Sequence, residues 1–360
     1  MEIITVTPHM RQEYDRFIQA MPHGSFRQGY AWGEVMSYYH EIIRLALLRD
    51  GEITGALSLQ KKRLPASPYS FFYAPRGPVV DYGDPEALAA LTSEARRQAA
   101  AHRALFIRID PDALDENDVV RQRLAEVGFR YLEGKNWSFF NYPRVLMRLD
   151  TTAPEEELLK GLRKKHRQHI NTLAAKGVTI ESVRGEAGLQ EFYDLMTDLS
   201  VRKGFPLRSL DYYRKLMAEF GDDARILIAR HDGTNLAGVL SLVYGNKAWY
   251  MHGATVDDKG SIHPAEGLHW EMIRWAQERG CIFYDFGGTG TDYPPREDNP
   301  NYYLYHFKKG FGAEIHYLTG YYDLLCNRPL YPLFRFMEEK GLPLAMKARA
   351  GLRRKFSHHE

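Results

Sequence analysis

The sequence contains the same series of elements twice, and this internal repeat constrains the fold more than any other feature. Residues 47–60 and 228–243 each hold two apolar runs joined by an Asp-Gly pair, which is typical of a hairpin between antiparallel strands. The pair stands at Asp50 and again at Asp232, 182 residues later. Each hairpin also continues into the same Leu-Ser-Leu tripeptide. The chain therefore contains two copies of one structural unit.

Three further elements follow each hairpin in the same order: an aromatic strand, an amphipathic helix and an apolar strand with an acid near its end. Asp110 follows Gly77 by 33 residues, and Asp285 follows Gly253 by 32. We expect the aromatic strands at 71–80 and 248–256, the helices at 85–102 and 264–279, and the last strands at 105–111 and 281–288.

This order of elements predicts an α+β fold and resembles the GNAT acyltransferase fold, in which a helix crosses between neighbouring strands. We expect two tandem GNAT-like domains that arose by internal duplication, residues 1–147 and 148–317. Two threonines, a proline and three glutamates in 151–157 predict a helix start with a threonine cap just after the boundary. The strand-like 317–325 belongs to neither repeat, so residues 318–360 are expected to complete the first domain.

Composition excludes several classes of protein. The net charge is only +2, so a patch that binds a polyanion has to be local. Cys281 and Cys326 match no metal or disulfide framework, and Cys281 is expected in the core. The N-terminus does not resemble a signal peptide, and no apolar run approaches the roughly 18 residues of a membrane span. We expect a soluble cytoplasmic protein.

A basic helix is predicted at 160–176, with six lysines and arginines and no acid. It is either a solvated face or a contact with phosphate groups of RNA or a pyrophosphate. His166 and His169 lie three residues apart on one face, which could suit a metal ion. Because no carboxylate or cysteine is near them in the sequence, we expect no metal site.

A Gly-Gly-x-Gly motif begins at Gly287 and Gly288, after a predicted strand. The prolines that follow exclude a helix, so the motif fails the context of a dinucleotide or P-loop site. We expect these glycines to allow a sharp turn or the close approach of a substrate, next to a loop at 292–303. No cofactor is expected. Asp110, at a strand end, is either a structural hydrogen-bond acceptor or a substrate contact.

The stretch HFKKGFGAE, residues 306–314, places Lys308 and Lys309 before a Gly-Phe-Gly turn. We expect it beside the end of a strand. It is either an ordinary hairpin corner or a place where one ammonium is held over a negative charge. In a strand the two lysines would point to opposite faces, and Lys309 is expected to face solvent or RNA.

Several motifs in a fixed order resemble those of the Fem-type (FemABX) aminoacyl-tRNA-dependent peptidyltransferases, which build peptidoglycan cross-bridges or side branches. The match is carried by YDFGGTG (284–290), FKKGFGAEIHYLTGYYDLL (307–325), SFRQGYAWGEV (25–35), APRGPVVD (74–81), LRKKHRQHINTLAAKGV (162–178), LSVRKGFPLRSLDYYRKL (199–216) and YMHGAT (250–255). The family's fold is two GNAT-like domains. Some members insert a long helical hairpin, but only 163–177 separate LLKGL from VTIESV here, so the compact type is expected.

The resemblance implies an activity and its partners. An amino acid would pass from aminoacyl-tRNA, as co-substrate, to the stem-peptide amine of a peptidoglycan precursor, either UDP-MurNAc-pentapeptide or lipid II. Neither a metal nor a coenzyme is implied, because the tRNA ester supplies the activation. No stable protein partner is inferred. Residues 341–356 are apolar and basic together, so they either contact the inner face of the membrane or form a docked terminal helix.

The resemblance also implies roles for individual residues. Lys308 would stabilise the oxyanion with Phe307 beside it, and Asp110 would orient or deprotonate the amine. Arg202 would bind the phosphates of the precursor. The remaining substrate-binding positions implied are Tyr250, Arg76, Trp32, Gly287 and Gly288.

The sequence departs from the family pattern at two places. Met36 stands where the family has a phosphate-binding lysine, and Tyr321 and Tyr322 stand where many members have Gly-Glu. Two alternatives therefore stay open. One is transfer from tRNA or another acyl donor to a small peptide-like metabolite, and the other is a non-catalytic binding module on the same scaffold.

Overall fold

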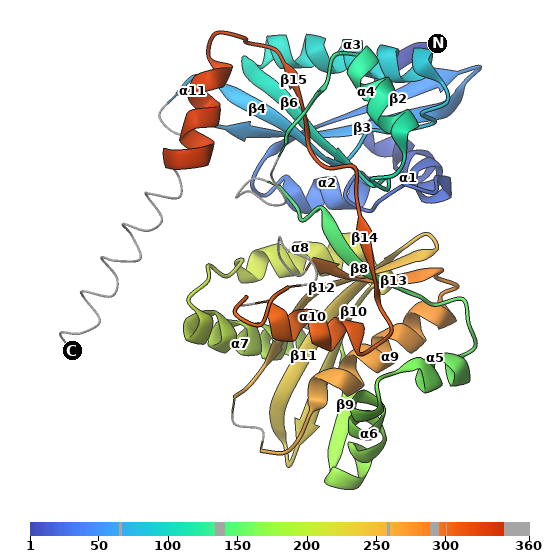
Figure 1. Ribbon diagram of the computed structural model, residues 1–360, viewed down its shortest axis with the longest axis vertical. Coiled ribbons are helices and arrows are strands. Elements are labelled where there is room, and N and C mark those ends of the chain that lie inside the picture. The colour runs from blue at the N-terminus through green and yellow to red at the C-terminus, as the bar shows by residue number, and fades with distance from the viewer. Residues whose placement is uncertain (65–66, 134–140, 258–259, 289–294, 300, 342–360) are drawn as a thin grey trace, which may run out of the picture.

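The computed structural model describes residues 1–64, 67–133, 141–257, 260–288, 295–299 and 301–341. Within these ranges, no helix is long and apolar enough to cross a membrane. The chain forms two halves, one above the other in Figure 1, each built on one mixed sheet. The expected membrane contact at 341–356 lies almost wholly outside the described residues, and so does part of the 292–303 loop.

The two sheets have matching strand orders. The first runs β1 (Glu2–Thr5), β2 (Glu41–Arg49), β3 (Glu52–Arg63), β4 (Ser70–Arg76), β6 (Ala104–Pro111), β15 (Tyr322–Leu325) and β7 (Arg130–Tyr131), with β5 (Val79–Val80) beside β3. The second runs β9 (Val178–Val183), β10 (Ala224–His231), β11 (Thr234–Tyr244), β12 (Lys247–Thr255), β13 (Phe283–Gly288), β8 (Val145–Asp150) and β14 (Glu314–Tyr317).

Strand direction follows one rule in both sheets. The fourth and fifth strands of each order, β4 with β6 and β12 with β13, run parallel, and the other strand pairs run antiparallel. The sixth strand comes from outside the repeated unit in each half. It is β15 from the C-terminal part of the chain in the first sheet and β8 from the crossing between the halves in the second. The expected boundary at 147/148 falls inside β8.

The repeated elements are confirmed. In both hairpin turns the Asp and the Gly have positive φ, 53° and 86° at Asp50 and Gly51, and 47° and 74° at Asp232 and Gly233. This conformation matches the twist of two-residue hairpins. The helices α3 (Pro85–Ala101) and α9 (Pro264–Glu278) follow the aromatic strands as predicted, and Asp84 caps α3 through the Ala87 N–H.

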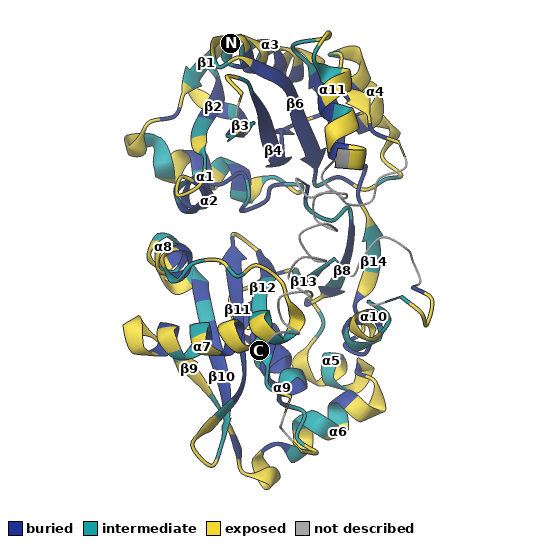
Figure 2. Cartoon of the chain, turned by 90° about the vertical axis from the view of Figure 1, so that its left-hand side faces the viewer, coloured by how far each residue is buried: buried dark blue, intermediate teal, exposed yellow. Residues whose placement is uncertain are grey.

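The remaining helices cover the sheets and join the halves. One hydrophobic core combines residues of both halves, because α2 of the first half packs on α8 of the second, and Figure 2 shows these helices facing each other across the boundary. The helices are η1 (Pro8–Met10), α1 (Arg11–Ala20), α2 (Tyr30–Met36), α4 (Asp118–Glu126), α5 (Glu155–Gly161), α6 (Lys164–Thr172), η2 (Ala174–Lys176), α7 (Gly185–Lys203), α8 (Leu210–Phe220), η3 (Gly221–Asp223), α10 (Tyr302–Lys309), α11 (Tyr331–Phe336) and the π-helical η4 (Met337–Gly341).

Three local expectations were wrong. The stretch 306–314 is not a hairpin corner at a strand end, because Lys308 and Lys309 form the last turn of α10. The predicted basic helix is two helices, α5 and α6, separated at Leu162 and Arg163. No threonine caps α5, whose N-cap residue is Pro154, because Thr152 bonds to Asp150 instead. Each error arises where an apolar or polar pattern fits more than one backbone path.

A buried ionic cluster fastens the C-terminal segment to the first sheet. Arg108 of β6 has a side chain with no solvent exposure and donates to both carboxylate oxygens of Asp323 in β15, at 2.7 and 2.8 Å. It also pairs with Glu338 of η4. Burial alone would lower the pKa of Arg108, but the two carboxylates raise it, so the guanidinium stays charged. Charge neutralisation inside the protein therefore holds β15 and η4 in place.

Replacing Arg108 by methionine should destabilise the fold strongly, because buried Asp323 loses its counter-ion and Glu338 loses one of its cationic partners, Arg335 being another. Breaking such a pair typically costs about 3–5 kcal/mol, measurable as a lower free energy of unfolding in urea. Arg97→Met is the matched control, since that side chain is 70% exposed and pairs with Glu94 on the surface. Equal stability of the two variants would show that the cluster does not hold the C-terminal segment.

Candidate active site

A gap opens between the two parallel strands of the second sheet. β12 and β13 pair only from Lys247 to Trp249 and from Phe283 to Asp285, whereas on its other edge β13 stays paired with β8 as far as Gly288, with a bulge after Asp285. In the first sheet the equivalent strands β4 and β6 stay paired as far as Arg76 and Pro111. The duplicated halves therefore differ at this point, and the second half has room for a ligand between its strands.

Two cavities meet at this gap. One, the interdomain cavity, has a volume of about 300 Å³ and is lined by both halves. The other, the second-half cavity, has a volume of about 350 Å³ and lies between β12, α9, α10 and the end of α7. Tyr250, Leu304 and Lys308 line both cavities. A side chain at this junction can contact two different ligands at once.

Lys308 is held at the junction by backbone carbonyls. Its side chain is buried, and Nζ donates to the carbonyl oxygens of Gly288 at 2.8 Å and Gly287 at 3.2 Å. An ammonium has three N–H donors, and the described residues accept two of them, which leaves the third available to a ligand as far as the described chain shows. Burial lowers the pKa of Lys308 to about 7, and the nearby Asp285 offsets only part of this effect. The charge of this lysine is therefore sensitive to a negative group placed beside it.

The Asp-Phe-Gly-Gly turn requires glycine at both positions 287 and 288. Gly287 has φ +71°, which disfavours any residue with a side chain. A Cβ on Gly288 would lie 2.5 Å from the Pro143 Cβ, so only glycine fits. Asp285 fixes the turn by accepting the Gly287 N–H at 2.7 Å. We expected the glycines to allow a sharp turn or the close approach of a substrate; Gly287 has a turn conformation, and the carbonyl groups of both glycines accept hydrogen bonds from Lys308.

An ionic chain connects this turn to the first half. Arg148 of β8 donates to Asp285 at 2.9 Å and to both oxygens of Asp112 at 2.8 and 2.9 Å. Burial alone would raise the pKa of Asp112, but Arg148 and Arg76 lower it. Sequence reasoning missed Asp112 and Arg148. The available signal was another acid directly after β6, two residues beyond Asp110.

Asp110 lies behind the cavity wall. It is 1% exposed and accepts hydrogen bonds from the Tyr73 hydroxyl, the Arg76 N–H and the Arg76 guanidinium, at 2.8–3.0 Å. Arg76 has φ +60° and lines the interdomain cavity, where it also donates to the Pro143 carbonyl. The contacts of Asp110 thus favour the acceptor interpretation: it positions Arg76 in a strained backbone conformation.

Phe307 and His269 form an uncharged part of the second-half cavity wall beside Lys308. Phe307 lines this cavity, and its carbonyl oxygen lies 2.9 Å from Nε2 of His166. The His269 ring packs on Phe307 and Tyr250, with centroids 5.4 and 4.8 Å apart. Burial lowers the pKa of His269 to about 3, and Lys308 adds to the effect, so the ring is neutral. These side chains exclude water around Lys308.

The other two residues that were expected to bind substrate, Trp32 and Arg202, differ in whether they line a cavity. Trp32 is 2% exposed, packs edge-on against Phe26, and lines neither cavity. Arg202 lines the second-half cavity, but its guanidinium pairs with Asp198 at 2.8 Å and Asp257 at 2.6 Å. Its positive charge is therefore largely neutralised by protein.

A group of cations that sequence reasoning missed lies between the halves. It comprises Arg27, Lys62 and Arg208, none of which forms an ion pair with another residue that the structure describes. Arg208 lies over the rings of Tyr39 from the first half and Tyr212 from the second. Burial lowers the pKa of Lys62 to about 8, with Arg208 contributing. Arg27 and Lys62 are half-buried and Arg208 is exposed, so cations without a described acidic partner are accessible here to an anionic ligand.

The low pKa of Lys308 can be measured by NMR of protein with labelled lysine side chains. We expect one lysine to titrate near pH 7, because it loses its proton far more readily than an exposed lysine. Lys308→Met should remove this signal, and Lys309→Met, which changes the exposed neighbour, should leave it. A Lys308 signal that titrates only near the ordinary value of about 10.4 would contradict the burial argument.

The chain matches known proteins along most of its length. The model of the FemAB family matches residues 10–235 and 230–339. The chain is 28% identical to the lipid II:glycine glycyltransferase of Staphylococcus aureus, over 96% of this chain and 98% of that protein. It superposes on the crystal structure of FemX with a TM-score of 0.85 and 27% identity, covering 92% of this chain and 99% of that one.

A more distant match supports the fold alone. A tandem GNAT protein from the clavulanic acid biosynthesis pathway superposes with a TM-score of 0.54 at 13% identity, over 90% of this chain and 98% of that one. The expected tandem GNAT-like fold and the expected family are confirmed. The chain is a transferase and belongs to the FemAB family.

Proposed function

We propose that this protein transfers an amino acid from aminoacyl-tRNA to the stem-peptide amine of a peptidoglycan precursor. The observation that carries the proposal is Lys308, a buried ammonium at the junction of two cavities. A reaction between two large substrates needs two binding spaces that meet at the reacting atoms. The similarity to the lipid II:glycine glycyltransferase supports the choice of substrates.

In this proposal the aminoacyl ester enters the second-half cavity and the acceptor amine enters the interdomain cavity. The neutral amine attacks the ester carbonyl, a C–N bond forms, and the carbonyl oxygen becomes negative. The C–O bond to the ribose then breaks, and the amine proton leaves with the ribose hydroxyl or through solvent. The remaining N–H of Lys308 faces the oxyanion, whose charge raises the pKa of the lysine and keeps it protonated.

Water exclusion strengthens this interaction. Phe307, Tyr250 and the neutral His269 surround the ammonium with apolar and uncharged groups. A charge interaction is stronger in such surroundings than in water. Asp110 acts here as a positioning residue, because it holds Arg76 at the wall of the interdomain cavity.

The cations between the halves suit the precursor's pyrophosphate. Both UDP-MurNAc-pentapeptide and lipid II carry this group, so it is shared chemistry. Arg27, Lys62 and Arg208 offer positive charge without an acidic partner among the described residues, and Arg27 lines the interdomain cavity. We therefore propose Arg208 as the principal phosphate contact. Arg202, implied by the sequence motif, lies further towards the acyl-donor side and is paired with two aspartates.

The RNA part of the donor is assigned to α6. Its N-cap residue Arg163 and its first two residues, Lys164 and Lys165, are exposed, and His166 of the same helix bonds to the backbone of Phe307. A phosphate backbone lying on these cations would direct its 3′ end towards Lys308. The reaction would take place on the cytoplasmic side of the membrane, where charged tRNA is available.

Purified full-length protein can be tested with charged tRNAs and with UDP-MurNAc-pentapeptide or lipid II, using mass spectrometry to detect addition to the stem peptide. We expect addition with at least one amino acid. Addition to a small amine in the absence of either precursor would support the metabolite alternative. No addition with any charged tRNA and either precursor would remove the proposed function.

Lys308→Met should lower kcat by about 10²–10³-fold, because one oxyanion donor is lost. Lys309→Met is the matched control and should keep the wild-type rate, since that side chain is exposed at the end of the same helix. Single-turnover measurements would separate the chemical step from product release. Similar rates for both variants would place the oxyanion elsewhere.

Arg208→Ala should raise KM for the precursor by about 10–100-fold, the loss of one charge-assisted contact to phosphate. Arg16→Ala, which removes an exposed arginine of α1, should leave KM unchanged. A salt titration provides a second measurement, because KM for the precursor should depend less on ionic strength in Arg208→Ala than in the wild type. If only Arg202→Ala raised KM, the phosphate contact would be Arg202, as the sequence motif implied, and not Arg208.

A further inference from the structure

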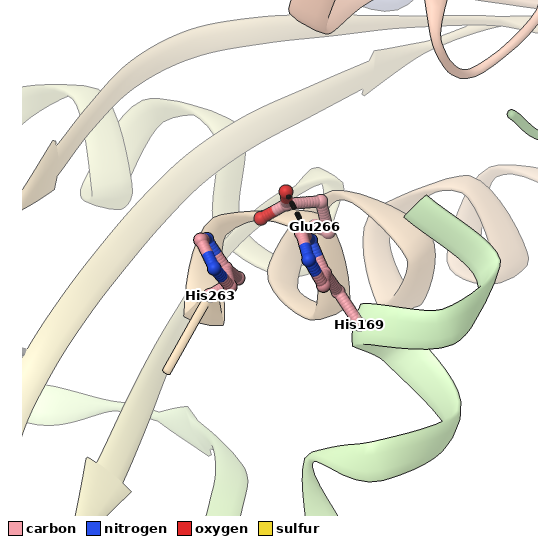
Figure 3. A group of neighbouring side chains, drawn as sticks. All are labelled: His169, His263 and Glu266. Atoms are coloured by element: carbon pink, nitrogen blue, oxygen red, sulfur yellow. Dashed lines mark hydrogen bonds and ion pairs between the residues drawn. The ribbon is translucent and has the colours of Figure 1, made fainter. Parts of the chain in front are cut away.

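Two histidines and a glutamate converge on the outer side of the second half. His169 comes from α6, His263 is the N-cap residue of α9, and Glu266 lies in the first turn of α9. Their candidate ligand atoms all lie within 4.8 Å of one another (Figure 3). The sequence argument against a metal at His166 and His169 relied on the lack of a nearby carboxylate. That reason was wrong, because folding places the Glu266 carboxylate 2.9 Å from His169 Nδ1.

The three side chains present their polar atoms to one place. The rings of His169 and His263 are stacked, with centroids 3.8 Å apart and planes 7° from parallel. Figure 3 shows the Glu266 carboxylate lying across the same edge of both rings. Glu266 is buried, whereas both histidines are half-buried, so solvent has partial access to the group.

Ordinary helix capping does not account for this group. A carboxylate in the first turn is favoured by the helix dipole, which explains why residue 266 carries a negative charge. A capping box would need an N-cap side chain bonded to the helix backbone, and His263 makes no such bond. Capping also gives no reason for a second imidazole, from another helix, to stack on the first.

We propose that His169, His263 and Glu266 bind a divalent first-row transition metal ion, with zinc as the best match. Two imidazole nitrogens and one carboxylate oxygen form a known zinc ligand set that leaves a fourth position for water. Zinc bonds of about 2.0–2.2 Å place neighbouring ligand atoms roughly 3.3 Å apart. In the present structure the ligand atoms lie within 4.8 Å of one another, and in this proposal rotation of the half-buried imidazoles brings them to the shorter spacing. Magnesium and calcium prefer oxygen ligands and should not compete.

The ion would act as a clamp rather than as a catalyst. Ala265 and Leu268, on either side of Glu266 in α9, line the second-half cavity, whereas the three ligands do not. His166, one turn before His169 in α6, bonds to the Phe307 carbonyl. Joining α6 to the start of α9 would therefore fix one wall of that cavity without contact with the reacting atoms. The inference stands independently of the proposed transfer reaction.

The test is isothermal titration of the metal-stripped, full-length protein with Zn²⁺, alongside Co²⁺ absorption spectra and thermal unfolding. We expect a single zinc ion per chain and a higher midpoint of unfolding in its presence. His169→Ala and Glu266→Gln should each weaken binding by at least about tenfold, since even indirect ligand partners have effects of this size. Glu266→Gln keeps the size and shape of the side chain, so it separates metal binding from folding.

His9→Ala is the matched control, because His9 is an exposed histidine in η1 of the first half. It should bind zinc as the wild type does. Equal affinity in all variants would show only adventitious surface binding and would overturn the proposal. The same conclusion would follow if the wild type bound no zinc, or if Mg²⁺ raised the midpoint of unfolding as much as Zn²⁺.

Discussion

The site depends on the contact between the Lys308 ammonium and two backbone carbonyl groups, those of Gly287 and Gly288. Without them a buried lysine would have no polar partner and would give up its proton or leave the interior. Carbonyl groups satisfy two donors without adding a full negative charge, so the ammonium keeps both its position and its attraction for an anion. This contact also explains why the Asp-Phe-Gly-Gly turn and the Phe-Lys-Lys-Gly-Phe-Gly stretch occur together in one sequence.

The duplication gives the chain two similar halves, but their parallel strand pairs have different uses. In the first half β4 and β6 remain paired, and the end of β6 carries Asp110, which binds Arg76. In the second half β12 and β13 separate, and Asp285 at the corresponding place supports the turn that holds Lys308. Arg148 links the two halves through Asp112 and Asp285. The first half thus contributes Arg76 to a wall of the interdomain cavity, and the second half contributes the gap between β12 and β13.

Much of the fold could be predicted because its signals are local. The Asp-Gly turns, the period of α3 and α9, and the order of repeated elements are all readable within short windows of sequence. The site was only partly predictable. Lys308 stood out beside its glycines, but its place in α10 did not, since a short aromatic and basic stretch fits either a helix or a hairpin. Contacts that join distant segments, such as His169 with Glu266 or Arg208 with Tyr39, leave no pattern in one sequence.

The central claim is that Lys308 recognises the negative charge of the tetrahedral intermediate. Its most direct measurement compares the affinities of two analogues that join an aminoacyl-nucleoside mimic to the stem-peptide amine, one with an anionic phosphonate at the reacting carbon and one with a neutral amide. Wild-type protein should prefer the anionic analogue, and Lys308→Met should lose about 10²–10³-fold of that preference. An unchanged preference in Lys308→Met would contradict the claim.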